Sequence, residues 1–368
     1  MEALARITRA VRDRVPDWGW LGVAERWLRG LLVVGLFLLA VRLLGTSTDA
    51  LSPFLARHLP DVLGGPLSAL GLGWLATYVL LNGSVVAALG LSLFASGLLT
   101  LDQAFLVVAG SRLGAAAFVI LVGVFDHLRH ARRSLRKSLG LGLLTLIVTH
   151  TLYVPATAAG YLTLRLTPPE TVRALAADSV GIPPLTVLSG MTTGMTEILG
   201  AAPTFFVALG LLLVSLHLFD RLLDAVDMKR VRERWFTNLD NRWISFLLGT
   251  VMTTLTASVS FSVGIVVPVY NRRWIGADRL IPYVMGASLG TLADTLLVAV
   301  VLGTMLGTGT ILLMAAAVAV VILGFLVAYE PYRAAVEGTL EWMTGDRRTF
   351  ALAAAGLVAA PALLLLLG

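Results

Sequence analysis

Long apolar stretches constrain this chain more than any other feature of its sequence. Five of them approach or exceed the roughly 18–20 residues that a helix needs to cross a bilayer, and a sixth begins near Leu31. Soluble domains carry about 25% charged residues, whereas here the figure is 14% and the mean hydropathy is +0.87. The sequence therefore predicts an all-α integral membrane protein. The five stretches are residues 138–164, 203–219, 280–305, 311–329 and 349–367.

Clusters of Lys and Arg beside these stretches predict how the chain is oriented. Basic residues gather at 129–137, at 221–242 and more weakly at 333–348. Because cytoplasmic loops are enriched in Lys and Arg, we expect all three clusters and the N-terminus to face the cytoplasm of a multi-pass cell-membrane protein. No secretory signal peptide is recognised. Residues 1–28 resemble a basic amphipathic helix on an anionic leaflet, the alternative being a solvated basic tail.

Other features argue against several classes of function. The formal charge is +6, but the basic residues flank apolar spans instead of forming a nucleic-acid motif, so we expect no nucleic-acid partner. The chain has no cysteine, and its five histidines show no metal-ligand spacing. Nucleophile elbows, phosphate loops and dinucleotide fingerprints are missing from the sequence. We therefore expect neither an enzyme nor a cofactor, apart from sodium as a coupling ion.

An internal repeat divides the membrane part into two halves. Gly73 and Thr77 recur as Gly249 and Thr253, an offset of 176 residues. Aligned Gly, Thr, Ser and Asp residues rarely recur by chance in apolar sequence, so we infer a transporter-type repeat. The same offset, without a gap, relates Ser84 to Ser260, Asp102 to Asp278, Gly110 to Gly286, and Leu113-Gly114 to Leu289-Gly290.

The domain organisation follows from this repeat and from the charge clusters. We expect two inverted-topology repeats with re-entrant hairpins or broken helices. Inversion requires that residues 182–200, which contain Pro183 and Pro184, do not cross the membrane completely. If they do cross, the two repeats run parallel. The expected parts are the basic segment 1–28, a first repeat 29–165, a linker or re-entrant segment 166–202, and a second repeat 203–368.

Two motif pairs resemble those of the sodium-dependent phosphate cotransporter family. Each half of that family carries Gly-xxx-Thr, then Gln-Ser-Ser-Ser, then a Gly-Ala-Asn-Ile-Gly-Thr-Thr element. The corresponding segments here are 73–77, 81–84 and 110–114 in the first half, and 249–253, 257–260 and 286–291 in the second. Both signature glutamines are replaced, by Leu81 and Ala257. The resemblance implies a membrane transporter with a phosphate and sodium site at these segments.

Polar residues inside the apolar stretches are the candidate ligands. Asn82-Gly83-Ser84 is a helix-breaking triplet that fits an unwound tip, where helix N-termini hold anions and hydroxyls hold sodium. Helix–helix packing is the alternative for such small residues. The candidates are Asn82, Gly83, Ser84, Arg112, Thr256, Ser258, Ser260, Ser288, Thr291 and Asp294, with sodium placed at Ser258, Ser260 and Asp294.

Arg112 and Asp294 are the most informative of these candidates. A charge within the membrane costs roughly 2.5–3.5 kcal/mol on insertion scales, so such residues face a cavity or a partner. Arg112 stands where the family has Asn, and we expect it to bind the anion or to replace a sodium ion electrostatically. Asp294 is expected to ligate sodium or to carry a proton. The alternative for both is a structural pair with each other or a position at the membrane edge.

The leading interpretation is a secondary transporter that moves phosphate or a similar small inorganic anion together with sodium by alternating access. Two other interpretations stay open. One is a non-transporting membrane protein that has kept the fold as a partner or sensor subunit, which the replaced Gln-Ser-Ser-Ser elements favour. The other is a proton-coupled transporter of another solute. The lipid bilayer, the anion and sodium are the expected partners, and an oligomer is compatible with the sequence.

Overall fold

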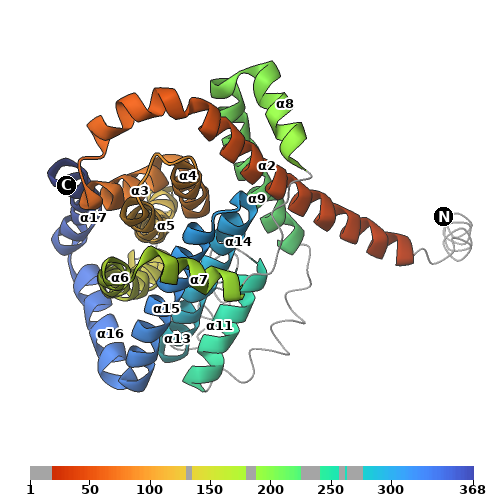
Figure 1. The fold of residues 1–368 in the computed structure, drawn as a ribbon. Coiled ribbons are helices and arrows are strands. Elements are labelled where there is room, and N and C mark those ends of the chain that lie inside the picture. The colour runs from red at the N-terminus through yellow and green to blue at the C-terminus, as the bar shows by residue number, and fades with distance from the viewer. Residues whose placement is uncertain (1–18, 130–134, 180–187, 225–240, 257–261, 263–276) are drawn as a thin grey trace, which may run out of the picture.

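The computed structural model describes residues 19–129, 135–179, 188–224, 241–256, 262 and 277–368, and within these ranges the chain folds into α-helices (Figure 1). The all-α class predicted from the apolar stretches is confirmed. The helices are α2 (Gly19–Val62), α3 (Pro66–Leu80), α4 (Gly83–Ala95), α5 (Leu101–Arg129), α6 (Leu135–Leu166), α7 (Pro169–Ser179), α8 (Ser189–Leu199), α9 (Ala201–Asp224), α11 (Arg242–Thr256), α13 (Ala277–Gly290), α14 (Leu292–Leu302), α15 (Met305–Val327), α16 (Tyr329–Gly345) and α17 (Arg347–Leu367).

Six helical segments in the described residues are long and apolar enough to cross a membrane. They overlap the stretches expected from the sequence, which supports a multi-pass membrane protein. The segments are Trp27–Val62, Gly142–Leu166, Ala201–Leu222, Asp278–Leu302, Met305–Val327 and Arg348–Leu367.

These segments are buried to very different extents. Only 6% of the most apolar window of Arg348–Leu367 is buried, against 72% for Asp278–Leu302. An apolar helix that its own protein leaves uncovered must contact lipid, so α17 faces the bilayer. Helices α13 and α14 form the central part of the bundle.

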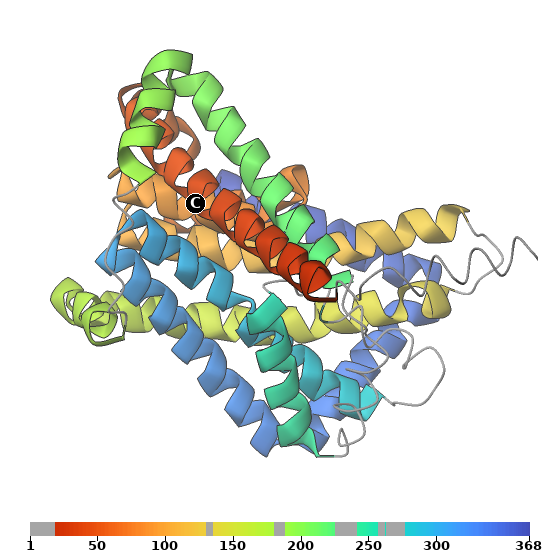
Figure 2. The ribbon, with the colours of Figure 1, turned by 90° about the vertical axis from the view of Figure 1, so that its right-hand side faces the viewer.

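Helix α2 is 44 residues long and curves along its length (Figure 1). Thr46 and Thr48 donate their hydroxyls to the carbonyls of Arg42 and Leu44, at 3.2 and 2.7 Å. Such back-bonding bends helices, and Pro53 removes a further backbone hydrogen bond. The bend brings α2 against α4, where Thr48 and Ser92 are hydrogen-bonded at 2.8 Å. Helix α2 also runs beside α9 (Figure 2).

Several helices are too short to cross the bilayer alone. Helix α3 has 15 residues and α4 has 13, which makes each about 20 Å long. A broken helix lies in the second half, where α13 and α14 are separated at Thr291. Helix α8 has 11 residues, about 16 Å, and a turn at Gly200 with φ +85° connects it directly to α9. A break at residues 82–84 and a short segment within 182–200 were expected, whereas the break at Thr291 falls inside the stretch 280–305, which the sequence suggested as one apolar span.

The packing of α3 on α5 repeats in the packing of α11 on α13. A Cβ added to Gly114 of α5 would lie 2.6 Å from the carbonyl oxygen of Trp74, and one added to Gly290 of α13 would lie 2.6 Å from that of Thr250. Trp74 and Thr250 are themselves 176 residues apart, so both contacting sides follow the offset read from the sequence. Each pair of helices meets through glycines because no larger residue fits there. The inverted orientation of the two halves stays a prediction.

Helix α2 begins at Gly19, so the last part of the expected segment 1–28 belongs to the same helix as the first membrane span. Residues 1–18 lie outside the described ranges. Between the halves, α7 packs against α15, and a Cβ on Gly309 would collide with the carbonyl oxygen of Val172. The segment 166–202 is thus held against the second half by α7.

Candidate ion and anion site

A buried arginine joins the two halves of the protein. Arg112 lies on α5 and is 4% exposed. Its Nη1 donates to Thr291 Oγ1 at 2.9 Å, and its Nη2 lies 3.3 Å from Asp294 Oδ1 and also donates to Thr295 Oγ1. Since Thr291, Asp294 and Thr295 belong to the second half, the guanidinium of the first half is held entirely by the second.

Asp294 completes the pairing from the start of α14. Its side chain is 2% exposed and that of Arg112 is 3% exposed, so the ion pair is removed from water. Its second oxygen, Oδ2, accepts a hydrogen bond from the hydroxyl of Ser84. Asp294 therefore binds two separate elements of the first half, α4 through Ser84 and α5 through Arg112.

The local sequence explains why Ser84 reaches this position. Leu81 adopts the left-handed conformation at φ 56°, which ends α3. Asn82 then caps α4, accepting hydrogen bonds from the backbone N–H groups of Ser84 and Val85 at 2.9 and 3.1 Å. Gly83 lets α4 approach α5, because a Cβ there would lie 2.7 Å from the carbonyl oxygen of Ser111. The triplet Asn82-Gly83-Ser84 thus forms the junction between two short helices beside Arg112.

The electrostatics of the network follow from its burial. The positive charge of Arg112 and the negative charge of Asp294 cancel, and the oxygens of Ser84, Thr291 and Thr295 satisfy part of the remaining hydrogen-bonding capacity. The Nε of Arg112 is buried without a hydrogen-bond partner. Removing one member of a buried ion pair typically costs about 3–5 kcal/mol, because it leaves the other charge uncompensated. The network is neutral only as a whole.

Chemically, the network is a set of oxygens around one cationic group. Carboxylate and hydroxyl oxygens are also the ligands that sodium takes in broken-helix transporters. The guanidinium therefore occupies a place suited to a cation. Arg112, Thr291, Asp294 and Ser84 are brought together as the sequence suggested, and of the two alternatives weighed for Arg112 and Asp294, the described structure shows the mutual pair.

The remaining candidate residues are placed differently. The hydroxyl of Ser288 donates to the carbonyl of Val284 in its own helix at 2.9 Å, while the carbonyl of Ser288 accepts a hydrogen bond from Tyr153 of α6 at 2.8 Å. Thr256 ends α11 and donates to the carbonyl of Met252 at 2.7 Å. Ser258 and Ser260 lie outside the described residues.

The sequence was compared with known protein families. A sequence profile of the Na+/Pi-cotransporter family matches residues 36–193 and 211–344, which is most of the chain. The chain belongs to the Na+/Pi-cotransporter family. Comparison with curated proteins and with solved structures gave no match. Family membership confirms the resemblance noted in the motifs, and the family is one of transporters and not of enzymes.

The family match also places the network between two matched regions. Ser84 and Arg112 lie in the first region, and Thr291 and Asp294 lie in the second. The unmatched residues 194–210 include the turn at Gly200 between α8 and α9. In this member of the Na+/Pi-cotransporter family, the polar contacts of Arg112 therefore connect one matched region to the other.

Two residues of interest were missed by sequence reasoning. Thr295 contacts Arg112, and its position directly after Asp294 was the available signal. Arg42 lies within the first apolar segment on α2, which contacts both α4 and α14. Its Nε and Nη2 atoms are buried and have no hydrogen-bond partner among the described residues. A lone charge inside an apolar span is itself a functional signal, and Arg42 could have been singled out on that ground.

Proposed function

We propose that the protein transports phosphate or a similar small inorganic anion together with sodium, by alternating access of its two halves. Membership of the Na+/Pi-cotransporter family supports sodium and phosphate as the solutes. The observation that carries the proposal is the buried Arg112–Asp294 pair, at 3.3 Å, because it joins the halves at the residues expected to form the site. Any relative movement of the halves must break or rearrange this pair.

Sodium binding and anion binding are coupled because sodium and Arg112 compete for Asp294. Without sodium, its carboxylate neutralises Arg112, and the guanidinium binds an anion only weakly, through the N–H donors that remain. A sodium ion bound by Asp294 and by the hydroxyls of Thr291 or Thr295 repels the like charge of Arg112 and displaces it from these oxygens. The released guanidinium offers parallel N–H donors, which bind tetrahedral oxyanions in bidentate fashion. Sodium binding thus prepares anion binding.

Arg112 also replaces the neutral Asn of the family motif. A fixed positive charge in a low-dielectric site disfavours a sodium ion beside it. We infer that the first-half sodium site is absent and that Arg112 is its electrostatic substitute. The remaining sodium dependence then comes from the second half, through Asp294 with Ser258, Ser260 and Ser288.

Arg42 adds a second positive charge within the membrane. Burying a polar group without a partner is costly, and the two unsatisfied nitrogens of Arg42 are donors. An anion entering between α2 and its neighbours α4 and α14 would satisfy them. We propose that Arg42 attracts the anion towards the site.

The paired state of Arg112 also suits a second candidate, a non-transporting member of the family. A buried ion pair that never opens would hold the two halves together permanently. The two candidates differ in one measurable property, which is solute movement driven by an ion gradient.

The test is uptake of radiolabelled phosphate into proteoliposomes under an inward sodium gradient. A potassium gradient, a proton gradient and protein-free liposomes are the comparisons. We expect uptake only with protein and sodium. Uptake driven by protons instead would overturn sodium coupling, and no uptake under any gradient, with folded protein in the liposomes, would favour the non-transporting candidate. Asp294→Asn is the matched variant, and it should abolish the sodium-driven component.

A further inference from the structure

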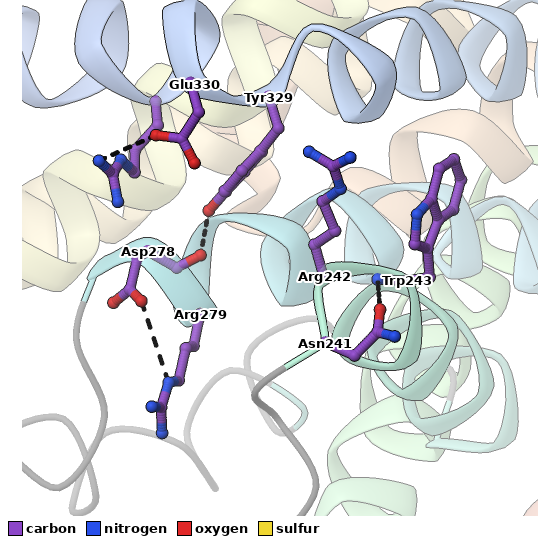
Figure 3. A pocket seen from close by; sticks show the side chains of 8 residues that line it. Asn241, Arg242, Trp243, Asp278, Arg279, Tyr329 and Glu330 are labelled. Carbon is purple, nitrogen blue, oxygen red and sulfur yellow. Dashed lines mark hydrogen bonds and ion pairs between the residues drawn. The ribbon is translucent and has the colours of Figure 1, made fainter.

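A second group of arginines lies around a cavity of about 580 Å³ (Figure 3). The cavity is formed where α11, α13 and α16 begin, so three chain segments contribute to it. Among the described residues, its charged lining consists of three arginines and two carboxylates, an excess of one positive charge. These residues are Arg242, Arg279, Arg333, Asp278 and Glu330, together with Asn241, Trp243 and Tyr329.

The positive charges of this cavity are only partly compensated. Arg333 lies 3.0 Å from Glu330, and Arg279 lies 3.9 Å from Asp278, in pairs that are largely exposed to solvent. Exposed pairs of this kind contribute little and rearrange easily. Within the described residues Arg242 has no carboxylate partner, and its guanidinium lies 5.8 Å from the centre of the Tyr329 ring. The Nε of Arg333 is buried without a hydrogen-bond partner.

The remaining polar groups hold the helix ends that form the cavity. Tyr329 donates its hydroxyl to the backbone carbonyl of Asp278, which ties α16 to the start of α13 (Figure 3). Burial, followed by the negative charge of Asp278, raises the pKa of Tyr329, so that its phenol stays protonated and remains a donor. Asn241 caps α11 through the N–H of Trp243 at 2.9 Å. The starts of α13 and α16 are therefore fixed relative to each other beside the cavity.

An apolar surface continues directly from this cavity. Helix α11 exposes one face that starts with Trp243 and runs along Leu247 and Leu255. In a membrane protein such a face contacts acyl chains, and tryptophan at its end marks the level of the lipid head groups. The cavity thus lies where the lipid phosphates lie. The cluster 221–242 is also one of those that the charge distribution assigns to the cytoplasmic side.

We propose that this cavity binds the phosphate group of an anionic phospholipid, with Arg242 and Arg333 as the principal ligands and the acyl chains along the exposed face of α11. Basic pockets between membrane helices bind anionic head groups in this manner. Guanidinium groups bind phosphate oxygens bidentately. The same cavity chemistry would accept free inorganic phosphate, and the experiment separates the two sources. The proposal does not depend on transport.

The test measures the thermal unfolding midpoint of the full-length protein in neutral detergent and without sodium. The probes are short-chain phosphatidylglycerol, short-chain phosphatidylcholine and inorganic phosphate. We expect phosphatidylglycerol to raise the midpoint with saturation, phosphatidylcholine to have little effect, and Arg242→Gln to weaken the apparent affinity about tenfold. Arg173→Gln, which alters an exposed arginine on α7, is the matched control and should leave the response unchanged.

Each other outcome has a defined meaning. If inorganic phosphate alone raises the midpoint and Arg242→Gln removes this effect, the cavity binds phosphate but not lipid, and the lipid source is wrong. If both lipids act equally, or if Arg242→Gln and Arg333→Gln respond like Arg173→Gln, the proposal is overturned. Arg242→Lys is a further check, because it keeps the charge but loses the bidentate geometry and should retain only part of the affinity.

Discussion

Arg112 and Arg242 show two ways in which this protein accommodates a positive charge. Arg112 is buried, and the protein supplies its counter-charge through Asp294 together with two threonine hydroxyls. Arg242 stands at the rim of an open cavity and has an aromatic ring but no carboxylate beside it among the described residues. The free-energy cost of an uncompensated charge rises as water is excluded. The buried site of Arg112 must therefore be neutral on its own, whereas Arg242 at the open cavity can be neutralised by an external anion.

The largest effect is expected from removing the counter-charge inside the bundle. Asp294→Asn leaves Arg112 buried and uncompensated, and should lower the free energy of unfolding by about 3–5 kcal/mol. Arg242→Gln should change it by less than about 0.5 kcal/mol. Unfolding in detergent measures both. The double variant Arg112→Met/Asp294→Leu should recover much of the loss, since both charges are gone. Equal stability of Asp294→Asn and the unmodified protein would remove the distinction between the two arginines.

A smaller effect tests the helix packing that holds the interior site together. Gly114→Ala and Gly290→Ala each place a Cβ 2.6 Å from a carbonyl oxygen, and each should cost about 1–3 kcal/mol. Gly324→Ala on α15 is the control, because nothing lies within 4 Å of its added Cβ. Similar losses at Gly114 and Gly290 would support equivalent roles in the two repeats. A loss of stability at only one of them would show that the two matching glycines do not contribute equally to the free energy of unfolding.

Arg42 is intermediate between Arg112 and Arg242. It lies within an apolar span of α2, and among the described residues two of its nitrogens have no hydrogen-bond partner, as expected for an anion site. Arg42→Met should leave the protein as stable or raise its stability by about 1 kcal/mol, while raising the phosphate concentration needed for half-maximal uptake. Thermal unfolding and uptake would be measured on the same preparation. A marked loss of stability would mean that Arg42 is structural.

A further comparison concerns two serines at opposite ends of α4. Ser84 donates to buried Asp294, and Ser96 donates to Asp49 at 2.5 Å on the exposed surface. Ser84→Ala should cost about 1–2 kcal/mol, as expected when a hydrogen bond to a buried charge is lost. Ser96→Ala should cost less than about 0.5 kcal/mol. Chemical unfolding of both variants gives the comparison, and equal costs would argue that burial does not decide the strength of this contact.

Much of the fold could be predicted because its signals are local. The apolar stretch 203–219 corresponds to the span Ala201–Leu222 in the structure, because the hydropathy of a helix decides whether it can lie in lipid. The break at Asn82-Gly83-Ser84 follows from the capping chemistry of Asn. The repeat was visible because glycines that pack helices must recur at matching positions, and Gly114 and Gly290 do so.

The pairing within the site could not be predicted in the same way. Arg112 and Asp294 are 182 residues apart, and only the packing of α14 against the first half brings them within hydrogen-bonding distance. The sequence indicated that both need a partner, but it offered their mutual pairing only as an alternative to an anion at Arg112 and a cation at Asp294. The cavity at the starts of α11, α13 and α16 could not be predicted either, because Arg242, Arg279 and Arg333 belong to three separate segments.

The most direct test of the central claim is the sodium dependence of phosphate uptake by Arg112→Asn in proteoliposomes. An Asn offers neutral ligands and leaves room for a cation, whereas the guanidinium brings a fixed charge and five donors. We predict that at low sodium the variant needs about tenfold more phosphate for half-maximal uptake, from the loss of charge-assisted hydrogen bonds, and that its uptake depends more steeply on sodium. If Arg112→Asn changes neither the phosphate requirement nor the sodium dependence, Arg112 is not the electrostatic substitute for sodium and the account is contradicted.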